Sequence, residues 1–284
     1  MSGPLLIADC GATSGKWALV DRSSGAVARF VTGPVNPSVY TREQIDAEIL
    51  KVAGKCCVAP VEACIYAAGA IGEGCMQLAC AVSEILGIPP QSVIVESDLT
   101  GAAKALLGTT RGVACILGTG SNSCLWSGYV IEKNMPPMGY ILGDEGSGAS
   151  IGAALLRGAI RSQFPRELME LWKSTYPELT YAEVVEKVYR QRCGSGYIAS
   201  FVAFAAENIS HPSIAGIVDD CFSRFIEAVT ASYPEAVRLP LAFTGGVASV
   251  FESRLRRVAS LYGLNISRIS PDPLDLLVAR SLAT

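Results

Sequence analysis

Two carboxylates in this sequence lie where a predicted strand gives way to a turn or a helix. Asp9 ends the apolar run 5–9 and precedes the small-residue turn Cys10-Gly-Ala-Thr-Ser-Gly. Asp98 follows a second apolar run, 93–96, and opens a predicted helix. Open α/β sheets bind ligands at the carboxyl ends of their strands, so these side chains could hold a metal ion or accept a proton. As a structural residue Asp98 would be a helix N-cap, an ordinary role for aspartate that can hold together with a chemical one.

Two turns rich in glycine and hydroxyl side chains could bind phosphate. The first contains Gly11, Thr13 and Ser14, and the second is Gly118-Thr-Gly-Ser-Asn. Small residues let backbone N–H groups approach phosphate oxygens closely, and the hydroxyls add donors. An ordinary hairpin turn would also explain each of them. The Walker A pattern is absent, and Gly118-x-Gly120 lacks the third glycine and the following helix of a Rossmann loop.

Two further segments join turns to predicted helices. Gly143-Asp-Glu-Gly-Ser carries adjacent carboxylates, and Thr244-Gly-Gly follows an apolar strand. The first could be no more than a helix start, with Asp144 or Ser147 as the N-cap and Glu145 near the positive end of the helix. Glycines in the second would let a flat adenine lie against the backbone, although an ordinary strand-to-helix turn explains them equally well.

The elements that position these residues follow one pattern twice. The chain begins with a predicted three-stranded meander, and from residue 113 a strand, a small-residue turn and a strand recur. The predicted strands are 5–9, 17–20, 28–31, 64–68, 93–96, 113–117, 124–126, 239–243 and 265–269. Residues 147–232 are predicted to be mainly helical, and one helix is predicted to run from the Thr244 turn to Leu261. We therefore expect two lobes, 1–105 and 106–271, with the helical insertion in the second and helix 272–284 completing the first.

The composition limits the class of protein. The chain has 284 residues, 17% of them charged, and a net charge of −3, which gives no general attraction to nucleic acid or to an anionic membrane. No signal peptide is recognisable, and the apolar runs are shorter than the ~20 residues that span a bilayer. The ten cysteines form no Cys-x-x-Cys pair and there is a single histidine, so we expect reduced thiols in a cytoplasmic protein.

In this order the segments resemble those of the N-acetylglucosamine kinases and the related BadF/BadG/BcrA/BcrD ATPases of the actin, hexokinase and heat-shock chaperone superfamily. Residues 9–14 look like the first phosphate motif, 118–122 like the second and 244–248 like the adenosine motif. The 143–147 segment is typical of the N-acetylglucosamine kinases. The resemblance covers nearly the whole chain, with one departure: Cys10 stands where the first motif usually has glycine.

The resemblance implies a two-lobed, actin-like (ribonuclease H-like) ATPase fold, with a mixed sheet and flanking helices in each lobe and a cleft between the lobes. It also implies an ATP- and Mg²⁺-dependent kinase that phosphorylates the 6-hydroxyl of N-acetylglucosamine or a related amino sugar. Asp98 would be the catalytic base, and Asp9 would organise Mg²⁺ through water. The implied ATP contacts are Asp9, Gly11, Thr13, Ser14, Gly118, Thr119, Gly120, Gly245 and Gly246. The implied sugar contacts are Asn36, Ser121, Asn122, Gly139 and Asp144.

Other functions stay open. A BadF-type activator would couple ATP hydrolysis to electron transfer into a CoA-ester dehydratase or reductase, through an iron–sulfur cluster between two subunits. It needs suitably placed cysteines, and the ten present here show no convincing cluster motif. A non-catalytic sugar or nucleotide sensor is the other alternative. We further expect a homodimer whose partner is the small sugar, with no nucleic acid or membrane partner.

Overall fold

The structure is a computed structural model that describes residues 3–190 and 194–283. The chain divides into two compact units, each assembled from segments that are distant in sequence. The first unit comprises Met1–Ala114, Cys124–Lys133 and Asp272–Thr284, and the second comprises Cys115–Ser123 and Asn134–Pro271. The lobe boundaries expected from the sequence, at residues 105 and 271, remain a proposal.

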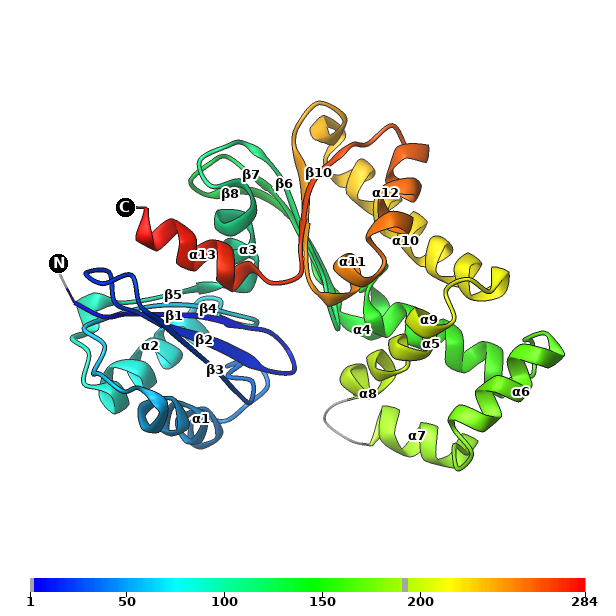
Figure 1. Ribbon diagram of the computed structural model, residues 1–284, viewed down its shortest axis with the longest axis horizontal. Helices are drawn as coiled ribbons and strands as arrows, with labels where there is room; N and C mark the ends of the chain where they lie inside the picture. Colours follow the sequence, from blue (N-terminus) through cyan, green and yellow to red (C-terminus); the bar gives the residue numbers. More distant parts are fainter. Residues whose placement is uncertain (1–2, 191–193, 284) are drawn as a thin grey trace. The chain divides into compact units, whose positions relative to one another are not determined.

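The first unit is built on a mixed five-stranded sheet with the order β3-β2-β1-β4-β5 (Figure 1). Its strands are β1 Leu5–Cys10, β2 Gly15–Val20, β3 Val27–Thr32, β4 Glu62–Ala67 and β5 Val93–Ser97. β1, β2 and β3 form the predicted antiparallel meander, while β4 pairs parallel to β1 and β5 parallel to β4. The carboxyl ends of β1, β4 and β5 therefore lie along one edge, which brings the ends of the Asp9 and Asp98 segments to the same side.

Two helices pack on each face of this sheet. α1 (Arg42–Lys55) and α2 (Glu73–Leu86) cover one face, and α3 (Asp98–Leu107) and α13 (Pro273–Leu282) cover the other (Figure 1). Successive side chains of β1 point to opposite faces of the sheet, so the strand contributes to a hydrophobic core on each face. Leu6 faces the first pair of helices and Leu5 faces the second. Thr41 and Gln44 form the predicted capping box of α1. The short 3-10 helix η1 (Pro90–Ser92) leads into β5.

A second five-stranded sheet has the order β10-β9-β6-β7-β8, which matches the first sheet when it is read from β8. Its strands are β6 Gly112–Leu117, β7 Ser121–Trp126, β8 Ile131–Met135, β9 Leu241–Thr244 and β10 Ile266–Ser270. The recurrence predicted from the sequence is confirmed. The sequence analysis missed β8, because an edge strand with the polar sequence Ile-Glu-Lys-Asn-Met carries no apolar signal.

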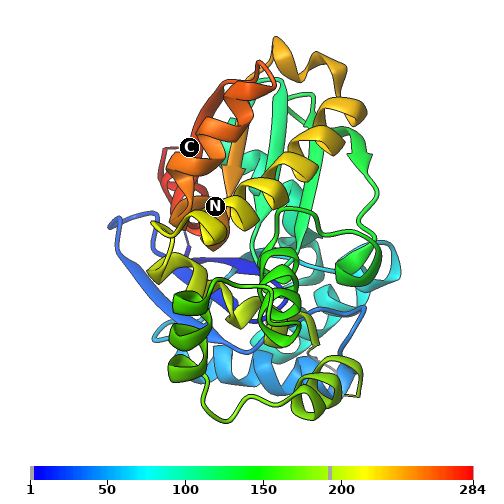
Figure 2. The same cartoon turned by 90° about the vertical axis from the view of Figure 1, so that its right-hand side faces the viewer.

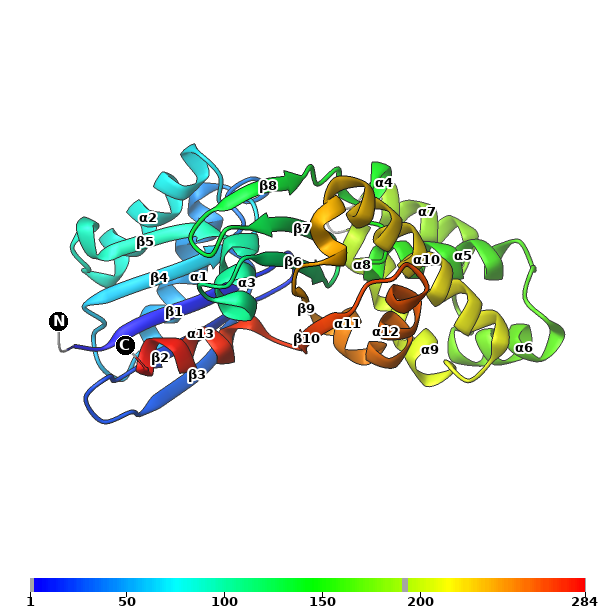
Figure 3. The same ribbon diagram turned by 90° about the horizontal axis from the view of Figure 1, so that it is seen from above.

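Helices make up most of the second unit. They are α4 Gly139–Leu142, α5 Gly148–Ile160, α6 Arg166–Thr175, α7 Tyr181–Tyr189, α8 Gly194–Ser200, α9 Val202–Glu207, α10 Pro212–Ser232, η2 Pro234–Val237, α11 Gly246–Val250 and α12 Glu252–Leu261. Figure 2 shows α10, in yellow, across the green strands, and Phe225 of α10 contacts Phe243 of β9 with 6.0 Å between ring centroids. Figure 3 shows α6 to α9 grouped beside α5, where Trp172 stacks on Phe201 at 5.6 Å.

One predicted helix of the second unit is divided in the structure. The helix expected to run unbroken to Leu261 is two helices, since α11 ends at Val250 and α12 starts at Glu252. Among the described residues, no helix combines the length and the apolar character that crossing a bilayer requires.

Candidate active site

Asp9 lies near the end of β1, on the face of the first sheet that carries α3 and α13. Leu5 and Ile7 of the same strand belong to the core on this face, and Asp9 follows them with the period of two. Burial, followed by the charges of Asp272 and Asp98, raises the pKa of Asp9 to about 7, while Lys16 opposes the rise. The Asp9 carboxylate is therefore in surroundings that favour binding of a cation.

Asp98 is the first residue of α3 but is not its N-cap. That role belongs to Ser97, whose hydroxyl accepts a hydrogen bond from the Thr100 N–H at 3.1 Å. The N-cap interpretation of Asp98 is therefore wrong. Asp98 Oδ1 accepts a bond from the Leu99 N–H at 2.8 Å. Burial raises the pKa of Asp98 to about 6 against the effect of these backbone donors, and such a value suits a general base near neutral pH.

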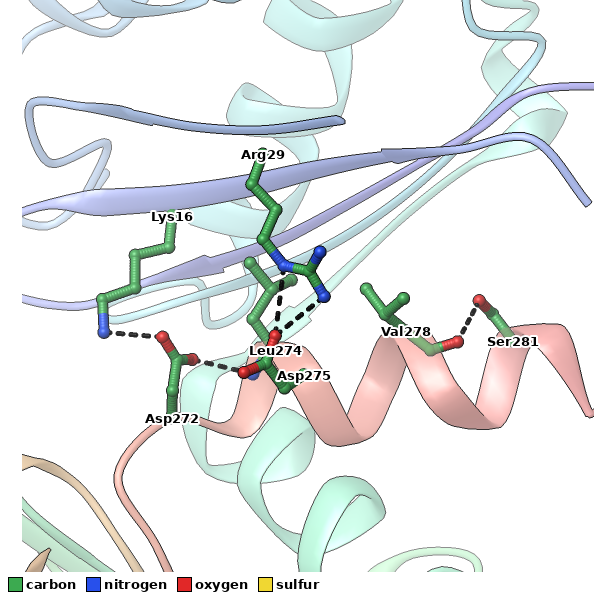
Figure 4. Close-up of polar contacts among 7 residues, drawn as sticks. All are labelled: Lys16, Arg29, Asp272, Leu274, Asp275, Val278 and Ser281. Carbon is green, nitrogen blue, oxygen red and sulfur yellow. Dashed lines mark hydrogen bonds and ion pairs between the residues drawn. The ribbon is translucent and has the colours of Figure 1, made fainter. Parts of the chain in front are cut away.

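Asp272, which the sequence analysis did not single out, completes an acidic group around Asp9. It is the N-cap of α13: Oδ1 accepts from the Leu274 N–H at 2.8 Å, and Oδ2 pairs with Lys16 Nζ at 2.7 Å (Figure 4). The sequence did hold a signal, because an aspartate followed by proline ahead of an apolar helix is the pattern of an N-cap with proline at N1. Its position beside Asp9 required the tertiary structure.

The surroundings of Asp9 fit the Mg²⁺ that the family resemblance implies. Mg²⁺ prefers oxygen ligands, keeps several waters and is commonly held by one or two carboxylates together with substrate phosphates. Asp9, Asp98 and Asp272 supply negative charge that the single Lys16 offsets only in part. In the part of the chain described, no three His, Cys, Asp or Glu side chains come close enough together to hold a metal ion by themselves. The metal role of Asp9 stays a prediction.

The first predicted phosphate turn is a four-residue loop between β1 and β2. The Gly11 N–H donates to the Ser14 carbonyl at 3.0 Å, and Thr13 is exposed. A Cβ added at Gly11 would meet no atom within 4 Å, so the loop is open there. Cys10 points to the opposite face of the sheet, where it is fully buried in the core with Trp17. Its thiol therefore does not obstruct the loop.

Asn36, a predicted sugar contact in the first unit, has its side-chain oxygen engaged locally. Oδ1 accepts from the N–H and the hydroxyl of Ser38 at 2.9 and 2.7 Å. A Cβ at Gly69, which follows β4 and has φ 72°, would overlap this oxygen. Asn36 is thus fixed against the carboxyl end of β4, and any bond to a sugar would have to use its amide N–H group.

The second phosphate turn packs against the start of α5 in the second unit. The Gly148 N–H donates to the Gly118 carbonyl at 2.8 Å, and the Ala149 N–H donates to the Thr119 carbonyl at 3.0 Å. Ser147 is the N-cap of α5, so the capping proposed for Asp144 or Ser147 belongs to the serine. Asp144 is left for other interactions.

Asp144 reaches the second turn. It adopts a left-handed conformation with φ 57°, and its Oδ1 accepts from the Ser121 N–H at 3.2 Å. A Cβ at Gly120 would lie 2.9 Å from Asp144 Oδ2, so a larger residue there would have to displace the Asp144 carboxylate. Burial raises the pKa of Asp144, and the bond from Ser121 opposes the rise. Ser121, Asn122 and Asp144 together line a hollow of about 70 Å³.

Two residues that the sequence analysis missed hold this hollow in shape. Asn134 Nδ2 donates to Asn122 Oδ1 at 2.9 Å and to the Ser123 carbonyl at 2.7 Å. The fully buried Tyr233 hydroxyl donates to the same carbonyl at 2.8 Å and accepts from the Met135 N–H at 2.6 Å. No sequence pattern linked Tyr233 to strands about a hundred residues earlier.

The predicted adenosine turn lies beside the second phosphate turn. Gly245 has φ 114°, and a Cβ there would overlap the Leu117 carbonyl, so only glycine allows this approach. A Cβ at Gly246 would meet nothing within 4 Å. Gly139, a predicted sugar contact, starts α4 and is not among the residues that line the hollow at Asp144.

The predicted site residues are therefore divided between the two units. Asp9, Gly11, Thr13, Ser14, Asn36 and Asp98 belong to the first unit. Gly118, Thr119, Gly120, Ser121, Asn122, Gly139, Asp144, Gly245 and Gly246 belong to the second.

Comparison with models of protein families and with curated proteins found no match. Solved structures do match, and they show an actin-like ATPase fold of the kind found in ROK kinases. A ROK family glucokinase from Streptomyces griseus, in complex with glucose and AMPPNP, superposes with a TM-score of 0.57 at 16% identity over 99% of both chains. A "Putative N-acetylglucosamine Kinase" from Chromobacterium violaceum gives 0.70 at 18% identity over 98% of both.

A third structure is much more similar. It is a "Putative N-acetylglucosamine Kinase" from Porphyromonas gingivalis, with a TM-score of 0.92 and 33% identity over 99% of both chains. The chain belongs to this family, the N-acetylglucosamine kinases and their BadF-type relatives within the actin-like superfamily.

Proposed function

We propose that this protein is an ATP-dependent sugar kinase that transfers the γ-phosphoryl group to the 6-hydroxyl of N-acetylglucosamine or a related amino sugar. The observation that carries the proposal is Asp98, the first residue of α3 directly after β5. Ser97 takes the capping role there, and the pKa of Asp98 is raised to about 6. Family membership and the printed names of the relatives from Porphyromonas gingivalis and Chromobacterium violaceum support the sugar-kinase class.

The proposed reaction is an in-line displacement at phosphorus. Asp98 accepts the proton of the sugar hydroxyl, the hydroxyl oxygen forms a bond to the γ-phosphorus, and the bond from that phosphorus to the bridging oxygen breaks to release ADP. The turns at Thr13 and Thr119 would hold the phosphates, and Gly245 and Gly246 would lie at the nucleoside. Mg²⁺, held near Asp9, would neutralise charge on the phosphates. Ser121, Asn122, Asn36 and Asp144 would bind the sugar.

The test is an ADP-release assay with a panel of sugars, including N-acetylglucosamine, glucosamine, N-acetylmannosamine and glucose, followed by NMR of the product to locate the phosphate. We expect the highest kcat/KM for an amino sugar and phosphate on the 6-oxygen. Asp98→Asn should lose turnover by a factor of about 10²–10⁴ while it stays folded, as expected for loss of a general base.

Controls separate this proposal from the alternatives. Asp275→Asn changes an exposed carboxylate on α13 that pairs with Arg29 and should leave turnover unchanged. Near-normal turnover of Asp98→Asn would refute the base assignment. ATP hydrolysis that no sugar stimulates, in a protein that copurifies with iron, would indicate the activator class, and binding without ADP release would indicate a sensor. In the cell we expect a cytoplasmic homodimer, which cell fractionation and light scattering can check.

A further inference from the structure

A cavity of about 380 Å³ lies within the first unit, on the face of its sheet that carries α3 and α13. Its floor comes from β1 and β4, including Ile7 and Tyr66, and its sides come from α3, α13 and the connection between β7 and β8. Of the described residues that line it, none is a predicted nucleotide or sugar contact. The volume falls in the range of about 300–1,000 Å³ that is typical of small-molecule sites.

Two glycines with positive φ lie in the walls of this cavity. Gly128 has φ 107°, and a Cβ there would overlap the carbonyl oxygen of Thr109. Gly108 has φ 58°, a conformation that residues with a side chain rarely adopt, and it lies against the guanidinium of Arg280. The Trp126 indole N–H donates to the Gly108 carbonyl at 2.8 Å. The cavity is therefore a built feature of the fold, with its walls pinned to one another.

The lining of the cavity is apolar, with two cationic side chains beside the apolar surface. Most of the lining side chains are aliphatic or aromatic, and the two that carry charge, Lys104 and Arg280, are both cations. Lys104 Nζ lies 5.5 Å from the centroid of the Tyr66 ring and pairs with Glu96 of β5. Arg280 Nε donates to the Ala105 carbonyl at 3.3 Å. These contacts hold both cations in place beside apolar surface, an arrangement that suits a ligand with an apolar body and a negative head.

We propose that this cavity binds a small amphipathic carboxylate, with its aromatic or branched aliphatic body on the apolar floor and its charged head near Lys104 and Arg280. The site is distinct from the proposed kinase site and does not depend on it. Arg280 and Leu277 belong to α13, the helix whose N-cap Asp272 pairs with Lys16 beside Asp9. A ligand in the cavity would thus contact the helix that supplies Asp272 to the acidic group.

The test compares two probes of the same shape, 4-phenylbutyrate and the neutral 4-phenylbutan-1-ol, by calorimetry and by ligand-observed NMR. We expect the carboxylate to bind with a Kd of about 1 mM or tighter, and about tenfold more tightly than the alcohol because of the two cations. Lys104→Met should remove most of that preference. Its matched control is Lys187→Met, which changes a lysine that also pairs with a glutamate and lies 5.0 Å from a tyrosine ring, but on α7.

A second variant blocks the cavity without changing charge. Ser281→Trp adds a large side chain at its margin and should abolish binding of both probes. Ser260→Trp is the matched control, because Ser260 also lies near a helix end and its hydroxyl also bonds the carbonyl three residues earlier. Circular dichroism and ADP release report whether each variant is folded. No binding of 4-phenylbutyrate to the wild-type protein, or binding that persists in Ser281→Trp, would overturn the proposal.

Discussion

Lys16 and Asp272 form an ion pair of 2.7 Å although 256 positions separate them in the sequence. Lys16 follows the first phosphate turn on β2, and Asp272 is the N-cap of the last helix, α13 (Figure 4). The pair fixes the start of α13 beside Asp9, where Lys16 lowers and Asp272 raises the pKa of Asp9. Because the two partners act in opposite directions on the same carboxyl, their variants should have opposite effects.

Lys16→Met is expected to raise the pKa of Asp9 above about 7, and Asp272→Asn is expected to lower it. Asparagine can still cap α13, so the second variant removes charge while the cap remains. Carboxyl-carbon NMR of Asp9 measures both shifts directly. Since the ion pair is partly exposed, we expect either variant to cost no more than about 1 kcal/mol of unfolding free energy. Shifts of Asp9 in the same direction would contradict this account.

Activity should depend on pH through Asp98. The proposed base must be ionised, and burial raises its pKa to about 6. At saturating Mg-ATP, kcat/KM for the sugar is expected to be level above pH 7 and to fall about tenfold for each pH unit below 6. A pH series of initial rates tests this, with coupling enzymes checked separately at each pH. A profile that stays level down to pH 5 would exclude Asp98 as the titrating base.

The free energy of unfolding should depend on the charge of Asp98 in the opposite direction to activity: ionisation of Asp98 favours activity and lowers stability. The folded-state pKa of Asp98 is raised, so its contribution to stability is fully present below the unfolded value near 3.8 and is lost as pH rises through about 6. Asp98→Asn removes the buried charge and should therefore stabilise the protein at pH 8, by about 1–3 kcal/mol, but have little effect near pH 4. Thermal denaturation at the two pH values measures the difference. Asp275→Asn, at an exposed position, should show no such pH-dependent gain.

Tyr233→Phe should impair sugar binding more than the chemical step. The change keeps the buried ring but leaves the Met135 N–H and the Ser123 carbonyl without the tyrosine hydroxyl. We expect a several-fold rise in KM for the sugar with kcat nearly unchanged, and a loss of about 1–3 kcal/mol of stability. Tyr262→Phe removes a hydroxyl bonded to an exposed glutamate and serves as the control. A fall in kcat at constant KM would exclude the positioning role.

The sequence by itself determined the local chemistry and much of the fold. Strand, turn and capping signals are local, because they depend on side-chain alternation and on backbone conformations that glycine, proline and Thr41 favour. They were therefore enough to predict the meander at Asp9, its recurrence at Gly118 and the capping box of α1. The edge strand β8 was not predicted, because a polar edge strand has no buried face and so shows no alternation of apolar residues in its sequence.

Only the tertiary structure decided which of these residues meet. Ser97, and not Asp98, caps α3, and Ser147, and not Asp144, caps α5, which leaves both aspartates available for other bonds. Asp272 reaches Lys16, and Tyr233 reaches β7 and β8, through contacts between segments far apart in the chain. Such contacts depend on how sheets and helices pack, and the burial that raises the pKa of Asp9 and Asp98 arises from the same packing. The residue types determined which chemistry is possible, and the packing determined the pKa values, and so the protonation states, of the carboxylates that would perform it.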